Sequence, residues 1–397
     1  MIDKDHPSET WIADLRTRFP CEAEVDWVLT RKLRNRAGAA YTPVKLDQLC
    51  AAVTDLLNAE LHDAFEVKNP RWLSGGASKL QMAFELDWHQ PGVGRTTTPL
   101  VLRMEPAASI VETSRLREFE LIKAFEGIVP VPPVFWVDRE GKYLPYPALI
   151  YGFAKGVTKP STAASGVSGT GINFGVELRK TLSKQFVEQL AAIHTFDWSK
   201  AQLSSFSVPA KNSTEGVEWQ INWWERVWTE DANEEVPLMR FAAKWMRANM
   251  PIIDHVSLLH GDYRSGNFLF TEENSQISAW LDWETGHLGD RHEDIAYSIC
   301  KPWGHMAEDG KTFLVCGMMS EPEFYEAYEK ASGLSVDKKR LNFYRILNAY
   351  KLNSIALATA YRAVAGGKTH QDIVLGCVMG ASYLFMDDLR QTLEEVA

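Results

Sequence analysis

Long apolar runs and a basic leader are both missing from this sequence of 397 residues. A membrane-spanning helix needs about 18 consecutive apolar residues or more, and no stretch comes near that length. The first residues, MIDKDHPSETW, also lack the basic and then apolar pattern of a secretory signal. We therefore expect no membrane segment and a cytoplasmic protein.

Cysteine and positive charge are also scarce. The five cysteines, at positions 21, 50, 300, 316 and 377, form no close pairs of the kind that zinc sites or disulfide frameworks use, which predicts reduced, buried thiols. Lys and Arg number 42 against 52 Asp and Glu, so the net charge is −10. This balance disfavours non-specific binding to nucleic acid or to an anionic membrane, and we expect neither partner.

What the sequence does have is one dense group of reactive polar residues in its second half. It reads SLLHGDYRSGNFLF, then TEENSQIS, then AWLDWETGHLGDRHEDIAY. Two short apolar runs, at 268–270 and 277–281, flank a polar turn, which predicts a β-hairpin. Such a hairpin would bring Asp262, Asn267 and Asp282 together at one end of a small sheet.

A carboxylate, a carboxamide five residues later and a second carboxylate after a hairpin suit phosphoryl transfer. A kinase needs a carboxylate to take the proton of the acceptor hydroxyl, and oxygen ligands for the Mg²⁺ that bridges the nucleotide phosphates. Asp262 fits the first role, and Asn267 with Asp282 fits the second. The alternative, in which these side chains only stabilise a tight turn, is disfavoured by the combined spacing.

HGDYRSGN followed by LDWE resembles the signature of the aminoglycoside phosphotransferase and choline kinase superfamily, closest to the kinase-like domains also found fused to acyl-CoA dehydrogenases. GDRHEDIAY resembles that family's GDP-x-x-DLA, with Arg291 at the usual proline. The resemblance implies an α+β, bilobal protein-kinase-like fold with a small antiparallel-sheet N-lobe and a mainly helical C-lobe. We expect a helical extension at 1–62, a nucleotide-binding N-lobe at 63–153, and a C-lobe with the catalytic loop and acceptor site at 154–397.

The N-terminal extension carries helical spacing at 10–18, 22–34 and 45–62. Amphipathic helices usually bury their apolar stripe. We therefore expect the extension to pack against a lobe or against a second subunit in a homodimer, with an independent function as the alternative.

Strand patterns follow, interrupted by the turn GGAS. Gly75 and Gly76 would let backbone amides approach nucleotide phosphates, with Ser78 as a further donor, although a plain hairpin turn is the alternative. The third strand, PLVLRMEP, carries Arg103 where the wider family has lysine. Arginine also grips phosphate, so Arg103 is the first candidate for the phosphate clamp and Lys79 is the second.

The amphipathic segment SRLREFELIKAF supplies Glu118, which the resemblance makes the partner of Arg103; a solvated helix carboxylate is the alternative. The strand YPALIYGFAKG would form the hinge between the lobes. Its backbone from Ile150 to Phe153 would bind adenine, a role compatible with packing of the same side chains in the core.

Other residues around the motif receive supporting roles. His260 is expected to order the catalytic loop, with Asp290 and Asp294 bracing it. Glu284 is a weaker candidate for a second metal position. Arg264 either neutralises charge on the transferring group or only anchors the loop.

These features predict Mg²⁺-dependent transfer of the γ-phosphate of ATP, or of GTP, to a hydroxyl of a small organic acceptor. A tryptophan-rich segment at 219–228 favours an apolar acceptor such as a hydroxy acid, a hydroxyacyl-CoA or a macrolide-like alcohol, although core packing is the more usual role of such residues. The alternatives are an aminoglycoside-type antibiotic kinase and, because of Arg103, a nucleotide-binding scaffold without activity.

Overall fold

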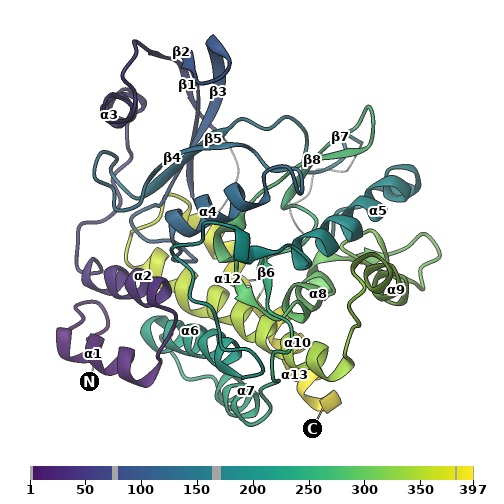
Figure 1. Cartoon of the computed structure of the whole chain (residues 1–397). Helices are drawn as coiled ribbons and strands as arrows, with labels where there is room; N and C mark the ends of the chain where they lie inside the picture. The colour runs from purple at the N-terminus through teal and green to yellow at the C-terminus, as the bar shows by residue number, and fades with distance from the viewer. Residues whose placement is uncertain (1–2, 74–78, 163–170, 381, 397) are drawn as a thin grey trace.

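The computed structural model describes residues 3–73, 79–162, 171–380 and 382–396 (Figure 1). Three helices come first in the chain, where helical spacing predicted them. They are α1 (Glu9–Arg18), α2 (Ala23–Arg34) and α3 (Leu46–Glu60). In Figure 1, α1 and α2 lie beside α6 (Glu215–Asp231), whereas α3 lies beside the sheet of the upper lobe.

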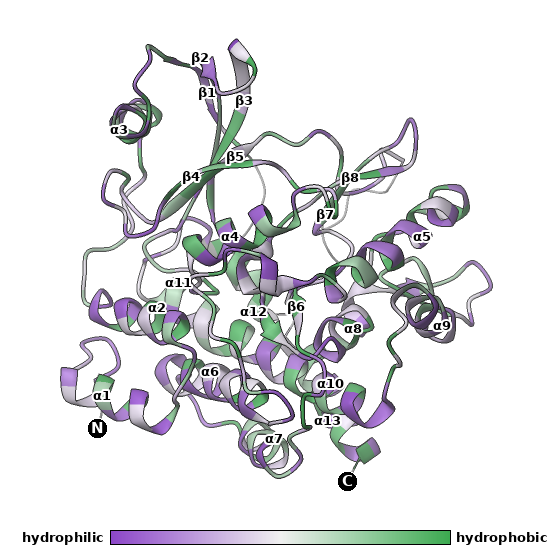
Figure 2. Cartoon of the chain, in the orientation of Figure 1, coloured by the Kyte–Doolittle hydropathy of each residue, from purple (hydrophilic) through white to green (hydrophobic). Residues whose placement is uncertain are grey.

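The upper lobe is built on a five-stranded sheet with the strand order β1-β2-β3-β5-β4, and neighbouring strands are antiparallel. Helix α4 (Arg115–Phe125) follows the third strand. The strands are β1 (Glu66–Trp72), β2 (Leu80–Gln90), β3 (Gly94–Met104), β4 (Val134–Asp138) and β5 (Ala148–Gly152). Figure 2 colours much of β4 and β5 as apolar, as expected for strands covered by other elements.

Alternation along β3 decides which side chains reach the lower lobe, because successive side chains of a strand point to opposite faces. Leu100, Leu102 and Met104 join the core that α3 covers. Val101 lies in the other core, which also contains residues of α4. Arg103 shares the face of Val101 and is therefore directed toward α4.

The lower lobe is mainly helical, and its described strands form three small sheets. Its elements are α5 (Gly175–His194), η1 (Trp198–Lys200), α6, α7 (Pro237–Ala248), β6 (Ser257–Leu259), β7 (Phe268–Thr271), β8 (Gln276–Trp280), η2 (Trp283–Thr285), β9 (His287–Gly289), α8 (His292–Ser298), η3 (Lys301–Trp303), β10 (His305–Met306), β11 (Phe313–Val315), β12 (Met319–Ser320), α9 (Glu321–Ser332), α10 (Lys338–Ser354), the π-helix η4 (Ile355–Thr359), α11 (Ala360–Ala365), α12 (Asp372–Gly380) and α13 (Ser382–Val396). None of the described helices is long and apolar enough to cross a bilayer.

The hairpin predicted around the polar turn is present as the antiparallel pair β7–β8. The helical stretch that begins with α10 is not α-helical throughout, since π-helical hydrogen bonding over Ile355–Thr359 separates α10 from α11. Within that segment the Thr359 hydroxyl donates to the Ile110 carbonyl at 2.6 Å, a tertiary contact that local spacing does not encode.

Candidate active site

The loop between β6 and β7 is held by Asp294 of α8. The Asp294 carboxylate accepts hydrogen bonds from the backbone N–H groups of His260 and Gly261, both at 2.8 Å, and lies 3.2 Å from His194 Nε2. Burial alone would raise the pKa of Asp294, but the hydrogen bond with His194 holds it below its usual value. The predicted bracing of the loop by Asp294 is thus present in the structure.

His260 connects this loop to the end of β8. Its Nε2 lies 3.0 Å from the Leu281 carbonyl oxygen, and its Nδ1 accepts the backbone N–H of Asp262 at 3.3 Å. These partners fit a neutral ring with its proton on Nε2, and burial lowers the pKa of His260. Asp290, which was expected to brace the same loop, instead accepts the backbone N–H of His292 at 3.0 Å, because it lies at the start of α8.

Asp262 is the candidate base, and its side chain is 23% exposed. Its Oδ1 lies 2.8 Å from Arg264 Nε, and the Tyr297 hydroxyl hydrogen-bonds to the same carboxylate. The Arg264 guanidinium also lies over the Trp303 ring, 4.6 Å from its centroid. Asp262 is therefore oriented from two sides while it keeps access to solvent.

The hairpin aligns the two candidate metal ligands. The Asn267 carboxamide nitrogen donates to the Asp262 backbone carbonyl at 2.8 Å, and the backbone carbonyl of Asn267 accepts the Leu281 N–H at 2.8 Å. Asp282 comes next, in a left-handed conformation with φ 59° and ψ 47° that is uncommon for a residue other than glycine. The register therefore brings Asp262, Asn267 and Asp282 to one end of the hairpin, where the sequence predicted them.

Arg103 joins this end of the hairpin to the upper lobe. Its guanidinium lies 2.7 Å from Asp282 Oδ1, 3.2 Å from Glu118 Oε1 and 3.6 Å from Glu284 Oε1. Burial alone would lower the pKa of Arg103, but the charges of Glu118 and Asp282 raise it well above its usual value. Arg103 is thus a permanent cation between α4 and the catalytic hairpin.

Lys79, the second candidate for the phosphate clamp, is 1% exposed and engaged elsewhere. Its Nζ lies 3.0 Å from Glu105, 2.9 Å from Glu284, 2.6 Å from the Ser109 hydroxyl and 2.9 Å from the Val111 carbonyl. With its donors committed to these groups, Lys79 serves to hold the network together.

Glu284 also contacts three cations. Besides Lys79 and Arg103, its carboxylate lies 3.1 Å from Arg115 of α4, which also pairs with Glu118. Burial alone would raise the pKa of Glu284, but Lys79, Arg103 and Arg115 lower it strongly. Arg115 was not singled out from the sequence, because nothing in its helix spacing distinguishes it from a solvated charge.

A lysine of α10 also reaches the catalytic loop. Lys351 Nζ donates to the Gly261 carbonyl at 2.5 Å and lies over the rings of Trp224 and Tyr297, at 5.6 and 5.1 Å from their centroids. Sequence reasoning missed Lys351, which belongs to no motif, and assigned no role to Tyr297, although Tyr297 ends the GDRHEDIAY segment. Trp224 of the tryptophan-rich segment therefore lies near this loop, and at 2% exposure it is packed in the core.

The structure describes only some of the residues that were predicted to contact the nucleotide. Gly75, Gly76 and Ser78 lie outside the described residues. Ile150 pairs with β3 on one side and β4 on the other, so its backbone lies inside the sheet. The Phe153 N–H donates to the Pro99 carbonyl at 2.9 Å.

The donor set at the hairpin fits Mg²⁺. The described residues contain no group of three or more His, Cys, Asp or Glu side chains arranged to hold a metal. Mg²⁺ is usually bound through one or two protein oxygens together with substrate phosphates and waters. Since the Asn267 nitrogen is turned to the loop backbone, its oxygen lies on the opposite side of the carboxamide, and Asp282 offers a carboxylate.

A cavity of about 660 Å³ opens elsewhere, between α1, α6 and α7. Trp11, Trp228 and Tyr350 contribute to its lining. Among the described residues, none of the predicted catalytic or metal-binding side chains lines it.

With this geometry in place, comparison with known proteins defines the class. The model of the phosphotransferase enzyme family matches residues 81–344, more than half of the chain. The chain therefore belongs to the phosphotransferase enzyme family.

Curated relatives include proteins much longer than this chain. The chain is 25% identical over 289 residues to acyl-CoA dehydrogenase family member 11 of Pongo abelii, covering 69% of this chain and 35% of that protein. It is 26% identical over 294 residues to the probable acyl-CoA dehydrogenase IBR3 of Arabidopsis thaliana, covering 69% and 34%. The chain thus spans about a third of the length of these relatives.

Solved structures share the fold. A putative aminoglycoside phosphotransferase from Ralstonia eutropha JMP134 has 21% identity and a TM-score of 0.60, with 86% of this chain and 98% of that chain covered. Macrolide 2'-phosphotransferase type I has 14% identity and a TM-score of 0.52, with coverage of 85% and 97%. The predicted bilobal, kinase-like α+β fold is confirmed.

Proposed function

We propose that this phosphotransferase uses ATP with Mg²⁺ to phosphorylate a hydroxyl of a small organic acceptor, with GTP as the alternative nucleotide. The observation that carries this proposal is the convergence of Asp262, Asn267, Asp282 and Arg103. The base, the metal ligands and a buried cation meet at one end of the hairpin. This set matches the parts that phosphoryl transfer needs.

In the proposed reaction, Asp262 Oδ accepts the proton of the acceptor hydroxyl as the hydroxyl oxygen attacks the γ-phosphorus. The bond from the γ-phosphorus to the β,γ-bridging oxygen breaks, and ADP leaves. Tyr297 and Arg264 hold the Asp262 carboxylate in orientation. Asn267 and Asp282 would hold the Mg²⁺, which neutralises charge on the nucleotide phosphates when bound.

Arg103 would contact the α and β phosphates while Glu118 fixes its position from α4. The 2.7 Å contact between Arg103 and Asp282 means that the cation already faces the metal-ligand position. Glu284 was considered for a second metal position, but its contacts with Lys79, Arg103 and Arg115 favour a role in holding these cations. For adenine, the hinge from Ile150 to Phe153 stays a prediction, although sheet pairing already occupies the backbone of Ile150 and the Phe153 N–H is donated to Pro99.

For the acceptor, we propose an apolar hydroxylated molecule: a hydroxy acid, a hydroxyacyl-CoA or a macrolide-like alcohol. The acyl-CoA dehydrogenase names of the curated relatives favour the acyl thioester within this set. Trp223 and Trp224 are only 4% and 2% exposed, so they pack in the core and give little support for a direct contact with an apolar acceptor. Support from that segment now rests on Trp219 and Trp228, which are partly buried.

The test is transfer from ATP, and in parallel from GTP, to a panel of 3-hydroxy acids, their CoA thioesters, a macrolide and an aminoglycoside, followed by ³¹P NMR. We expect a new phosphate monoester with at least one acyl-type acceptor, and none with Asp262→Ala. Binding of Mg²⁺–ATP without transfer to any acceptor would favour the scaffold without activity. A lack of nucleotide binding would overturn the proposal.

A further inference from the structure

Helix α4 carries charged residues that face in two directions. Glu118 points to Arg103, while its neighbour Arg117 points to the N-terminal extension. Arg117 Nη1 lies 2.8 Å from Glu22 Oε2, and Nη2 donates to the Ser205 carbonyl at 2.8 Å. The Glu22 and Arg117 side chains are 4% and 3% exposed, so this is a buried pair.

The start of α4 is held by the same part of the extension. Ser114, its N-cap, accepts the Arg117 N–H at 3.2 Å, and its hydroxyl donates to the Glu24 carboxylate. Glu24 also pairs with Arg139, which follows β4, at 2.6 Å. Apolar residues of α2 and α4 share one core: Val25, Leu29, Leu121, Ile122 and Phe125.

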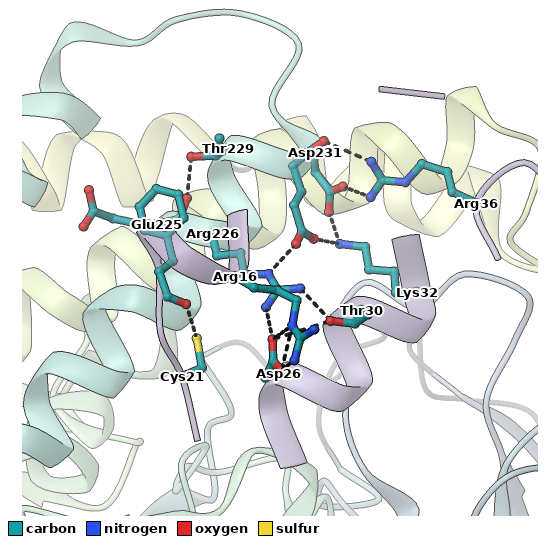
Figure 3. A network of polar contacts seen from close by, with 12 residues as sticks. Arg16, Cys21, Asp26, Thr30, Lys32, Arg36, Glu225, Arg226, Thr229 and Asp231 are labelled. Carbon is teal, nitrogen blue, oxygen red and sulfur yellow. Dashed lines mark hydrogen bonds and ion pairs between the residues drawn. The ribbon is translucent and has the colours of Figure 1, made fainter. Parts of the chain in front are cut away.

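Helix α2 is fixed to the lower lobe through α6 (Figure 3). Arg226 pairs with Asp26 at 2.7 Å. Lys32 pairs with Asp231 at 2.5 Å, and Arg36 contacts the same carboxylate. The Arg226 and Asp231 side chains are at most 1% exposed, and removing one partner of a buried ion pair is strongly destabilising because it leaves an uncompensated charge.

We propose that α2 is a brace that ties α4 to the lower lobe and so keeps Glu118, and through it Arg103, in position for the nucleotide. Glu22, Glu24 and Arg117 are positioning residues in this scheme. The inference rests on the proposed function of Arg103 and Glu118 as the phosphate clamp. It assigns to the extension a role in nucleotide binding, beyond the packing predicted from its sequence.

The first test replaces Glu22 by Gln in the full chain. Loss of the charge leaves Arg117 buried without its carboxylate, so α4 can shift. We expect the affinity for Mg²⁺–ATP to fall by about threefold to tenfold, with the KM for the acceptor unchanged. The matched control is Glu9→Gln in the same extension, because Glu9 pairs with Arg34 in an exposed contact, with side chains 68% and 54% exposed.

The variant Leu389→Ala distinguishes general destabilisation of the fold from a specific loss of nucleotide affinity. Leu389 is a fully buried core residue of α13, outside α2 and α4. This variant should lower the melting temperature at least as much as Glu22→Gln without changing nucleotide affinity. Equal loss of nucleotide affinity in Leu389→Ala and Glu22→Gln would overturn the brace.

A double-mutant cycle between Glu22→Gln and Glu118→Gln tests whether Glu22 affects ATP affinity through Glu118, because coupled sites give non-additive changes. If α2 acts through Glu118, Glu22→Gln should weaken ATP binding in the wild type and add little in Glu118→Gln. Full additivity, or no effect of Glu22→Gln, would overturn the brace while leaving the clamp intact. An unchanged ATP affinity in Glu118→Gln would overturn the clamp itself, and the brace with it.

Discussion

Asp262 is oriented by two neighbours and stays partly exposed, a combination that suits a group that exchanges a proton with a bound hydroxyl. We predict that Asp262→Ala loses phosphoryl transfer by about a hundredfold or more, as expected for removal of a general base. Nucleotide binding should be largely kept, because Asn267 and Asp282 remain. Turnover and Mg²⁺–ATP affinity measured side by side check this, and retention of most of the turnover would reject Asp262 as the base.

Arg103 and Lys79 give a second prediction, because the two cations have different surroundings. Arg103→Ala should weaken ATP binding and turnover together, and Arg103→Lys should keep measurable activity, since lysine supplies the same charge without the bidentate grip. Lys79→Ala should instead lower the melting temperature, because Glu105 and Glu284 would be left buried with one cation fewer.

The two substitutions are controls for each other when ATP affinity and melting temperature are both measured. Normal ATP use by Arg103→Ala would show that the β3 residue is not the clamp, and Glu118 would lose its proposed role.

At the scale of elements, the sequence was informative wherever the pattern is local. The hairpin was predictable because two apolar runs flank a polar turn, and Asp262, Asn267 and Asp282 then had to meet. The ion network around Glu284 could not be predicted, because Lys79, Arg115 and Glu284 come from segments that only the folded chain brings together. The π-helical interruption after α10 depends in the same way on packing rather than on spacing.

The contact between the catalytic loop and η2 leads to a prediction about Gly261. This residue has φ +78°, and a Cβ atom there would lie 2.5 Å from the Thr285 carbonyl oxygen. Gly261→Ala should therefore displace the loop, lowering both turnover and melting temperature. Gly310→Ala is the matched control, because Gly310 also has positive φ, at +63°, but its Cβ would meet no atom within 4 Å.

The control carries only the backbone strain of alanine in the left-handed region, about 1–2 kcal/mol. Equal melting temperatures and normal turnover in the two variants would show that the close approach of the loop to η2 is not needed.

At the scale of the whole molecule, the fold joins its lobes through buried charges, and it shifts the pKa values of buried histidines in opposite directions. Burial lowers the pKa of both His194 and His260, which lie against Asp294 and are neutral in the folded chain. His287 behaves oppositely: burial would lower its pKa, but the charge of Glu293 raises it above the usual value.

These directions set the sign of the pH dependence. A histidine with a lowered pKa contributes stability that is present above its unfolded pKa, about 6.5, and lost as pH falls through the folded pKa, because the unfolded chain binds more protons. His194→Gln should therefore reduce the fall in melting temperature between pH 8 and pH 5.5 relative to wild type. His287 contributes stability below about 6.5 that is lost as pH rises through its folded pKa, so His287→Gln should enlarge the same fall. Melting curves at both pH values compare the three proteins, and a steeper fall in His194→Gln than in wild type would contradict the assignment of a neutral His194 between Tyr328 and Asp294.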